Sequence, residues 1–273
     1  MIDRQTQQEL RNIYNPDDSD LRNLQLRMLE ILKSVDEICI KHGIPYWLSS
    51  GTLLGAVRHG GFIPWDDDID IELMRDDYVS LLKVLAKELP ERYVLQTIES
   101  DSGYVYLYAK IRDSNSLVNE NCVFNSRFKY KGAFIDIFPL ERTNKALARI
   151  ASVCYNRMCL GVVEKNGTKG FFRFNYFLLV NILFPFFRLL TLLCKKRRIS
   201  HTYGVGFIDA ERRENEIFPL CKISFEGYSF NAPLDYDAYL KRLYGSDYMQ
   251  IPSQKSVHIL DNRIKILTYP KKT

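Results

Sequence analysis

The sequence predicts a mixed α/β (α+β) fold in one domain that spans all 273 residues. Three observations lead to this prediction. Apolar residues recur at helical spacing between positions 21 and 38, acidic and aliphatic residues alternate in "DIDIEL" at 68 to 73, and several strand-like runs follow. A chain that alternates helices with runs of strands is typical of a sheet with flanking helices.

The N-terminal third supplies the first elements. A helix is expected after the cap candidates Ser19 and Asp20, ending at Gly43. "IPYWLSS" (44–50) is predicted as a strand and "TLLGAVRH" (52–59) as a short helix before a glycine pair. In an extended chain, residues 68–73 place their acids on one face and their aliphatic side chains on the other, which we expect to enter the core.

The later elements follow the same rules. A helix is predicted over 76–89, where Pro90 ends it. Strands are predicted in "YVLQTI", "YVYLYAKIR" and "GAFIDIFPL", which begin at residues 93, 104 and 132. The segment "DYDAYLKRLYG" indicates a helix with Asp235 as its cap and Gly245 as its end.

Residues 142–215 are expected to form a helical insertion in this domain. Within it, "FFRFNYFLLVNILFPFFRLLTLLCKKRRI" (171–199) is crowded with aromatic and aliphatic residues and ends in four consecutive bases before Ile199. Three roles fit this composition: contact with a membrane surface, a buried pair of core helices, or a true membrane span.

Overall charge and cysteine usage narrow the class of protein. The net charge of +5, from 38 basic and 33 acidic residues, is too small to indicate a nucleic-acid-binding protein. The six cysteines show neither CxxC pairs nor a disulfide framework. The first residues are polar and carry no apolar signal segment, so we expect a cytoplasmic protein with reduced thiols.

The acids carry the predicted chemistry. Carboxylates two positions apart on a strand point the same way, so Asp68 and Asp70 can share hard divalent cations, which prefer oxygen ligands. Asp136, between two isoleucines in "GAFIDIFPL", is expected on the polar face of another strand. Three such acids suit a two-metal phosphoryl-transfer centre, where one acid can also take the proton from the attacking hydroxyl.

Further residues complete the predicted site. Gly51 and Thr52 lie at a strand-to-helix turn, where free backbone N–H groups suit a phosphate. Arg58 follows within two helical turns, and Lys110 and Arg112 share one strand face. These three cations are expected to stabilise anionic oxygens, although each one taken alone also fits a surface ion pair.

Two other interpretations of the acidic run fit the sequence less well. A solvated acidic loop does not explain the framing of the run by "GFIPW" and by alternating aliphatic residues. A calcium-binding EF-hand loop is excluded, because Ile71 occupies the position that needs glycine and Asp77 the one that needs glutamate.

The stretch "YWLSSGTLLGAVRHGGFIPWDDDIDIEL" (46–73) resembles the signature of the LicD family, which includes the fukutin-type proteins. "GAFIDIFPL" and "YLKRLYGSDYMQIP" resemble its later motifs. The resemblance implies a nucleotidyltransferase-like fold, with Gly51 and Thr52 as the phosphate turn, Asp68 and Asp70 as metal ligands, and Asp136 as the third carboxylate. Asp66 and Asp67 extend the acidic run and could shift the metal-binding pair, and Asp113 is a second candidate for the third acid.

The same resemblance implies an activity. LicD-like proteins transfer a phospho-alcohol, typically phosphocholine, from a CDP-linked donor such as CDP-choline to a sugar hydroxyl of a cell-surface glycan, with CMP as leaving group. We therefore expect an enzyme that uses Mg²⁺ or Mn²⁺ and acts on a glycan, such as teichoic acid or lipopolysaccharide, or on its lipid-linked precursor. It would lie at the inner face of the cell membrane. A nucleotidyltransferase that releases pyrophosphate, and a non-catalytic subunit of a surface-polysaccharide complex, remain alternatives.

Overall fold

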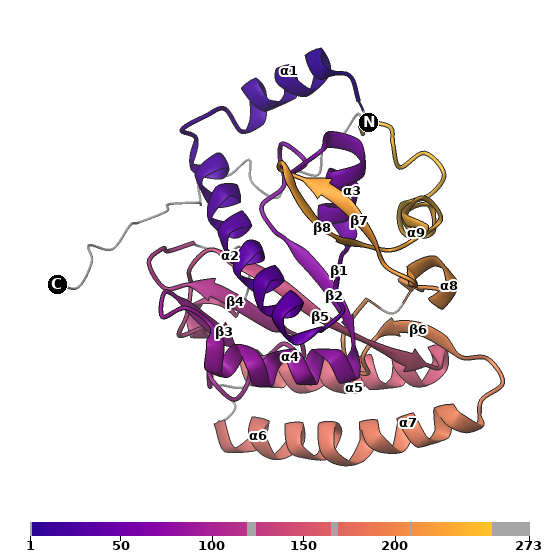
Figure 1. The fold of residues 1–273 in the computed structure, drawn as a ribbon. Coiled ribbons are helices and arrows are strands. Elements are labelled where there is room, and N and C mark those ends of the chain that lie inside the picture. Colours follow the sequence, from indigo (N-terminus) through magenta and orange to yellow (C-terminus); the bar gives the residue numbers. More distant parts are fainter. Residues whose placement is uncertain (1, 119–123, 165–168, 208, 253–273) are drawn as a thin grey trace.

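A six-stranded mixed sheet with flanking helices forms the body of the molecule, and a two-stranded hairpin forms a second, small sheet (Figure 1). The computed structural model describes the chain except for residues 1, 119–123, 165–168, 208 and 253–273. The observed arrangement confirms the predicted mixed α/β class.

Two helices precede the sheet, α1 (Arg4–Tyr14) and α2 (Asp20–His42). The caps of α2 are those predicted: the Ser19 side chain accepts a hydrogen bond from the Arg22 backbone N–H, and Gly43 adopts the left-handed conformation with φ of 62°. Helix α1 was not predicted, because its apolar residues are few.

The order of the sheet determines which residues meet. The strand order is β1-β2-β5-β4-β3, and β6 pairs with the part of β5 that extends beyond β4. The strands are β1 (Trp47–Leu48), β2 (Asp70–Met74), β3 (Tyr93–Gln96), β4 (Ala109–Asp113), β5 (Phe134–Thr143) and β6 (Arg198–His201). Strands β2 and β5 are parallel, whereas the other pairs are antiparallel. Sheet pairing therefore joins segments more than 60 residues apart in sequence.

Several predicted boundaries change. The strand predicted from Asp68 begins only at Asp70, where pairing with β5 starts, so Asp68 lies in the preceding loop. The strand predicted over 44–50 shrinks to two residues, and α3 (Ser50–His59) begins two residues early. Residues 104–108 precede β4 rather than form part of it. Helix α4 (Arg75–Glu88) matches the predicted helix within one residue.

The main core lies on the aliphatic face of the sheet, as the alternation predicted. Ile69, Ile71 and Leu73 are fully buried and belong to one cluster with the apolar residues of α2 and α4. Burial of this face fixes the opposite face of β2 as the one that carries Asp70.

The predicted insertion contains helices and a returning strand. Its helices are α5 (Lys145–Glu164), α6 (Lys169–Leu178), a π-helical turn η2 (Leu179–Leu183) and α7 (Phe184–Leu193), and β6 then adds a strand to the sheet. The segment Phe172–Leu193 is long and apolar enough to cross a membrane by length and composition, with a mean hydropathy of 1.9, and only 17% of that window is buried. Its inner side packs on a second apolar cluster that includes Tyr155 and Tyr203.

The C-terminal part packs next to β1, at the edge of the sheet. It contains α8 (Glu214–Ile217), the hairpin β7 (Cys221–Phe225) and β8 (Tyr228–Ala232), and α9 (Tyr236–Tyr244); a short 3₁₀ turn η1 (Asn125–Arg127) precedes β5. The Asp235 side chain caps α9 by accepting from the Ala238 backbone N–H at 2.9 Å, as predicted. Gly245 follows the last helical residue.

Candidate functional site

Sheet pairing brings three of the predicted residues together. In the parallel pair of β2 and β5, Asp70 lies opposite Asp136, and in the antiparallel pair of β4 and β5, Lys110 lies opposite Asp136. The Lys110 Nζ atom is 2.7 Å from Asp136 Oδ1, and both side chains are almost fully buried. Strand pairing therefore places one buried ion pair next to the Asp70 carboxylate.

The turn before β2 supplies more carboxylates. Ligand oxygens of Asp66, Asp67 and Asp68 lie within 4.8 Å of one another. The Gln25 side chain fixes this turn from α2, because its Nε2 atom donates to the Asp66 carbonyl at 2.9 Å. We call Asp66, Asp67, Asp68, Asp70 and Asp136 the acidic cluster.

The negative charges within the acidic cluster are only partly compensated. Burial, and then the charges of Asp68, Asp136 and Asp66, raise the pKa of Asp70 well above its usual value, while Lys110 acts in the opposite direction. Burial and the charges of Asp68 and Asp67 likewise raise the pKa of Asp66. A raised carboxyl pKa means that the charged form lacks compensation.

The donor set of the acidic cluster fits a hard divalent cation. Every donor is a carboxylate oxygen, which is the ligand type that Mg²⁺ and Mn²⁺ prefer. A cation of charge +2 would also supply the compensation that the raised pKa values of Asp66 and Asp70 show to be missing. Asp68, Asp70 and Asp136 remain the predicted ligands, and the position of Asp66 makes it a further candidate.

The N terminus of α3 lies beside this cluster. A Cβ atom on Gly51 would be 2.7 Å from Asp66 Oδ2, so glycine leaves room for that carboxylate. The Thr52 hydroxyl accepts from the Asp70 backbone N–H at 2.8 Å and thereby ties α3 to the start of β2. The predicted phosphate turn and the predicted metal ligands are therefore adjacent.

The predicted basic residues have different surroundings. Lys110 and Arg112 lie on one face of β4, and both stand over the Phe134 ring, at 3.5 and 4.7 Å from its centroid. Arg112 also donates to Gln96 Oε1 and to the Gly132 carbonyl.

Arg58 is bound to the C-terminal segment. Its guanidinium is buried and donates to the carbonyls of Tyr248 and Gln250 at 2.9 and 3.0 Å. Asp66 is close enough for its charge to affect the pKa of Arg58, which burial lowers. Arg58 therefore borders the acidic cluster while holding residues that follow α9.

Asp113, the second candidate for the third acid, lies elsewhere. Its side chain is fully buried between Arg27, at 2.8 Å, and Arg92, at 2.9 Å. It stands three positions from Lys110 on β4 and so points to the other face of the sheet. The structure brings Asp136, and not Asp113, to Asp70.

Two features of the site were not assigned from the sequence. Tyr244, the last residue of α9, is close enough to the acidic cluster that the charges of Asp70 and Asp66, after burial, raise its pKa. Glu72, which shares the Asp70 face, is fully buried and accepts from Tyr239 at 2.6 Å and from Arg212. The motif "YLKRLYGSDYMQIP" was the signal that pointed to α9, although no pattern singled out one residue in it.

Comparison with known proteins adds the relatives of this chain. The family described as LicD/FKTN/FKRP, nucleotidyltransferase domain, matches residues 43–157, which contain the whole acidic cluster. The lipopolysaccharide cholinephosphotransferase LicD of Haemophilus influenzae is 30% identical over 260 residues, which cover 88% of this chain and 96% of that protein.

Shorter matches concern other relatives. An uncharacterised protein of Rickettsia prowazekii is 48% identical over 127 residues, 43% of this chain and 46% of its own. The human ribitol 5-phosphate transferase FKRP is 54% identical over 35 residues, which cover 13% of this chain and 7% of that protein.

Proposed function

The chain belongs to the LicD/FKTN/FKRP family and is a phosphotransferase, and we propose that it transfers a phospho-alcohol, phosphocholine first, from a CDP-linked donor to a sugar hydroxyl of a cell-surface glycan. CMP would leave, and the acceptor would be the glycan or its lipid-linked precursor. The observation that carries this proposal is the acidic cluster, in which Asp70 and Asp136 stand opposite each other beside the N terminus of α3.

We assign the binding of the donor to the start of α3 and to the acidic cluster. Asp68 and Asp70 would hold Mg²⁺ or Mn²⁺, with Asp136 as a third ligand or as the base. A bound divalent cation supplies charge neutralisation to the donor pyrophosphate. The backbone N–H groups at Gly51 and Thr52 would bind a phosphate oxygen at the positive end of the helix.

Proton transfer is assigned to Asp136. Lys110 is 2.7 Å from its carboxylate, which orients the acid. An acceptor hydroxyl bound beside Asp136 would give its proton to an Asp136 carboxylate oxygen as it attacks phosphorus. Lys110 and Arg112, which both lie over the Phe134 ring, would stabilise the negative charge of the phosphoryl group. Arg58, which borders the acidic cluster, would add to this effect.

We also propose that the enzyme works in the cytoplasm, attached to the inner face of the cell membrane. The segment Phe172–Leu193 supports this placement, because its inner side packs on the domain while its outer side exposes large apolar residues, including Phe174, Phe177, Ile182, Leu189 and Leu193. Lys195, Lys196 and Arg197 follow directly and are exposed. A one-sided apolar helix with basic residues at its end favours the membrane surface over a span or a buried core.

Product analysis tests this function. The purified chain is incubated with Mg²⁺, a panel of CDP-alcohols and a glycan acceptor, and CMP is quantified beside pyrophosphate. We expect CMP to form only when the CDP-alcohol and the acceptor are both present, with CDP-choline the best donor. Pyrophosphate released from a nucleoside triphosphate, without CMP from any CDP-alcohol, would instead identify a nucleotidyltransferase. Asp76→Asn serves as a matched control, because Asp76 is fully exposed on α4.

A further inference from the structure

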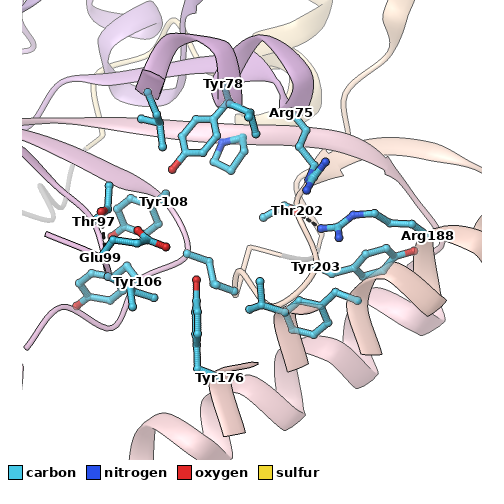
Figure 2. Close-up of a pocket in the computed structure, with 17 residues that line it drawn as sticks. Arg75, Tyr78, Thr97, Glu99, Tyr106, Tyr108, Tyr176, Arg188, Thr202 and Tyr203 are labelled. Atoms are coloured by element: carbon cyan, nitrogen blue, oxygen red, sulfur yellow. Dashed lines mark hydrogen bonds between the residues drawn. The ribbon is translucent and has the colours of Figure 1, made fainter. Parts of the chain in front are cut away.

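A cavity of about 170 Å³ lies between α4 and the inner side of the helix formed by α6, η2 and α7 (Figure 2). It reaches Pro139 of β5. This residue lies between the two paired regions of β5, because residues up to Ile137 pair with β4 and residues from Leu140 pair with β6. Pro139 is three residues from Asp136, about 10 Å along the strand and on the opposite face. Tyr108 also lines the cavity, and its ring centroid is 5.8 Å from Lys110 Nζ, so the cavity adjoins the acidic cluster but contains none of its acids.

One end of this cavity combines a carboxylate with aromatic side chains. Figure 2 shows Glu99 beside Tyr106 and Tyr108, with the hydroxyl groups of Tyr78 and Tyr176 directed toward the same space from α4 and α6. Tyr106 and Tyr108 are stacked, with ring centroids 5.1 Å apart. In the part of the chain that the structure describes, the Glu99 carboxylate forms no ion pair. Carboxylates and aromatic rings together are the usual surroundings of an ammonium group.

The charge of Glu99 reaches the tyrosines across this space. The pKa of Tyr176 is raised to about 12, first by burial and then by the Glu99 charge. Burial, followed by Glu99 and Tyr176, raises the pKa of Tyr78 as well. A cation between these groups would face one carboxylate and several oxygen or ring acceptors, with no competing cation from α4 at this end.

The other end carries two guanidinium groups. Arg75 and Arg188 extend toward each other near Thr202 (Figure 2). Arg188 donates from Nε and Nη2 to the Glu141 carboxylate at 2.6 and 3.1 Å, which fixes its position and offsets its charge. Arg75 lies 3.9 Å from Asp76, whose side chain is fully exposed, so its charge is only weakly offset. Arg75 therefore keeps more of its charge than Arg188, and two guanidinium groups at one end of a cavity suit a phosphate.

We infer that the cavity binds a phosphate-linked ammonium group, with the phosphate at Arg75 and Arg188 and the ammonium at Glu99 and the surrounding tyrosines. This site goes beyond the proposed function, because none of the residues assigned to the transfer lines the cavity. Its ligand has two possible sources, a soluble phospho-alcohol or the headgroup of a membrane lipid. Only the lipid source rests on the proposed membrane placement, since Tyr176 and Arg188 belong to the helix whose outer side is exposed.

Calorimetry on the full chain tests the two ends of the cavity separately. Phosphocholine, choline and inorganic phosphate are titrated in EDTA, so that the acidic cluster carries no divalent cation. Glu99→Gln should weaken phosphocholine and choline binding by about five- to tenfold, the value of one cation contact, and leave phosphate binding unchanged. Arg75→Gln should weaken phosphocholine and phosphate but not choline. Glu91→Gln and Lys83→Gln, exposed and outside the cavity, should match the wild type.

Vesicle sedimentation then identifies the source. If the ligand is a lipid headgroup, Glu99→Gln should lower binding to phosphatidylcholine vesicles and not to phosphatidylglycerol vesicles. If the ligand is soluble, both vesicle types should bind Glu99→Gln as they bind the wild type, while soluble phosphocholine still distinguishes the two proteins. The inference is overturned if phosphocholine shows no saturable binding, or if Glu99→Gln and Arg75→Gln bind it as the wild type does. CMP release by these variants reports on the proposed function independently.

Discussion

Asp70 and Glu72 lie two residues apart on the same face of β2, yet their surroundings are opposite in charge. The neighbours of Asp70 are mainly carboxylates, and burial together with those charges raises its pKa. Burial alone would raise the pKa of Glu72 too, but Arg212, His201 and a hydrogen bond from Tyr239 outweigh it and lower the pKa. One acid is therefore left for an external cation, whereas the other is already neutralised inside the fold.

The difference separates a site from a structural ion pair. Glu72 connects four distant segments, because Trp47, His201, Arg212 and Tyr239 all contact its carboxylate. Asp70 shares its space with acids that would repel one another without a cation. Substitution at the two positions should therefore affect different properties of the protein.

The largest effect is expected for Asp70→Asn. Loss of a metal ligand should lower CMP release by about three to four orders of magnitude, because metal-ion stabilisation of the transferring phosphoryl group is worth several kcal/mol. The melting temperature should stay the same or rise, since one of several crowded carboxylates loses its charge. Asp68→Asn should behave in the same way. Activity retained in both variants, with Asp76→Asn as the control, would remove the metal centre from the mechanism.

A slightly smaller loss is expected for Asp136→Asn. If Asp136 is the general base, transfer should fall by about two to four orders of magnitude while the CDP-linked donor still binds in the presence of Mg²⁺. Donor affinity is measured by calorimetry and transfer by CMP release. Loss of donor binding as severe as in Asp68→Asn would make Asp136 a metal ligand, and unchanged binding and transfer would reduce β5 to a core strand.

Glu72→Gln should instead lower the stability of the protein and leave its activity nearly unchanged. The Arg212 guanidinium would stay buried without its charge partner, which costs about 3–5 kcal/mol of unfolding free energy. CMP release per folded molecule should change little. Urea denaturation measures the stability, and the double variant with Arg212→Met should lose less than the sum of the single changes. An unchanged stability in Glu72→Gln would show that the buried pair does not hold these segments together.

The smallest effect per residue concerns membrane binding. Changing Lys195, Lys196 and Arg197 to glutamine should weaken sedimentation with anionic vesicles, at about 1 kcal/mol for each base near the surface. High salt should act like the substitutions. Replacing Lys83, Lys87 and Lys222 instead, all exposed elsewhere, serves as the matched control. A wild type that does not sediment with anionic vesicles at low salt would exclude this surface as the membrane contact.

Local signals explain what the sequence predicts well. Ser19 and Gly43 bound α2, and Asp235 and Gly245 bound α9, because caps act over a few residues. The alternation at 69–73 correctly predicts which face enters the core. The turn Glu226-Gly227, with φ of 51° and 82°, joins β7 to β8, and its glycine is a local signal for this hairpin, which was not predicted.

Partners far apart in the chain could not be predicted in this way. The alternation that places Glu72 beside Asp70 cannot tell that Arg212, 140 positions later, neutralises it. The strand start at Asp70 instead of Asp68 depends on where β1 ends and where the pairing with β5 begins, and the position of Tyr244 depends on how α9 packs. Long-range packing therefore decides which acids of one run form a site.

Direct counting of bound Mn²⁺ by electron paramagnetic resonance tests whether the acidic cluster is a metal-binding catalytic centre. Wild type, Asp70→Asn, Glu72→Gln and Asp76→Asn are titrated with Mn²⁺, and the free-ion signal is followed at each step. Wild type, Asp76→Asn and folded Glu72→Gln should bind Mn²⁺ with similar affinity, and Asp70→Asn should lose that binding together with CMP release. Equal Mn²⁺ binding in wild type and Asp70→Asn, or none in the wild type, would contradict a metal centre at Asp70.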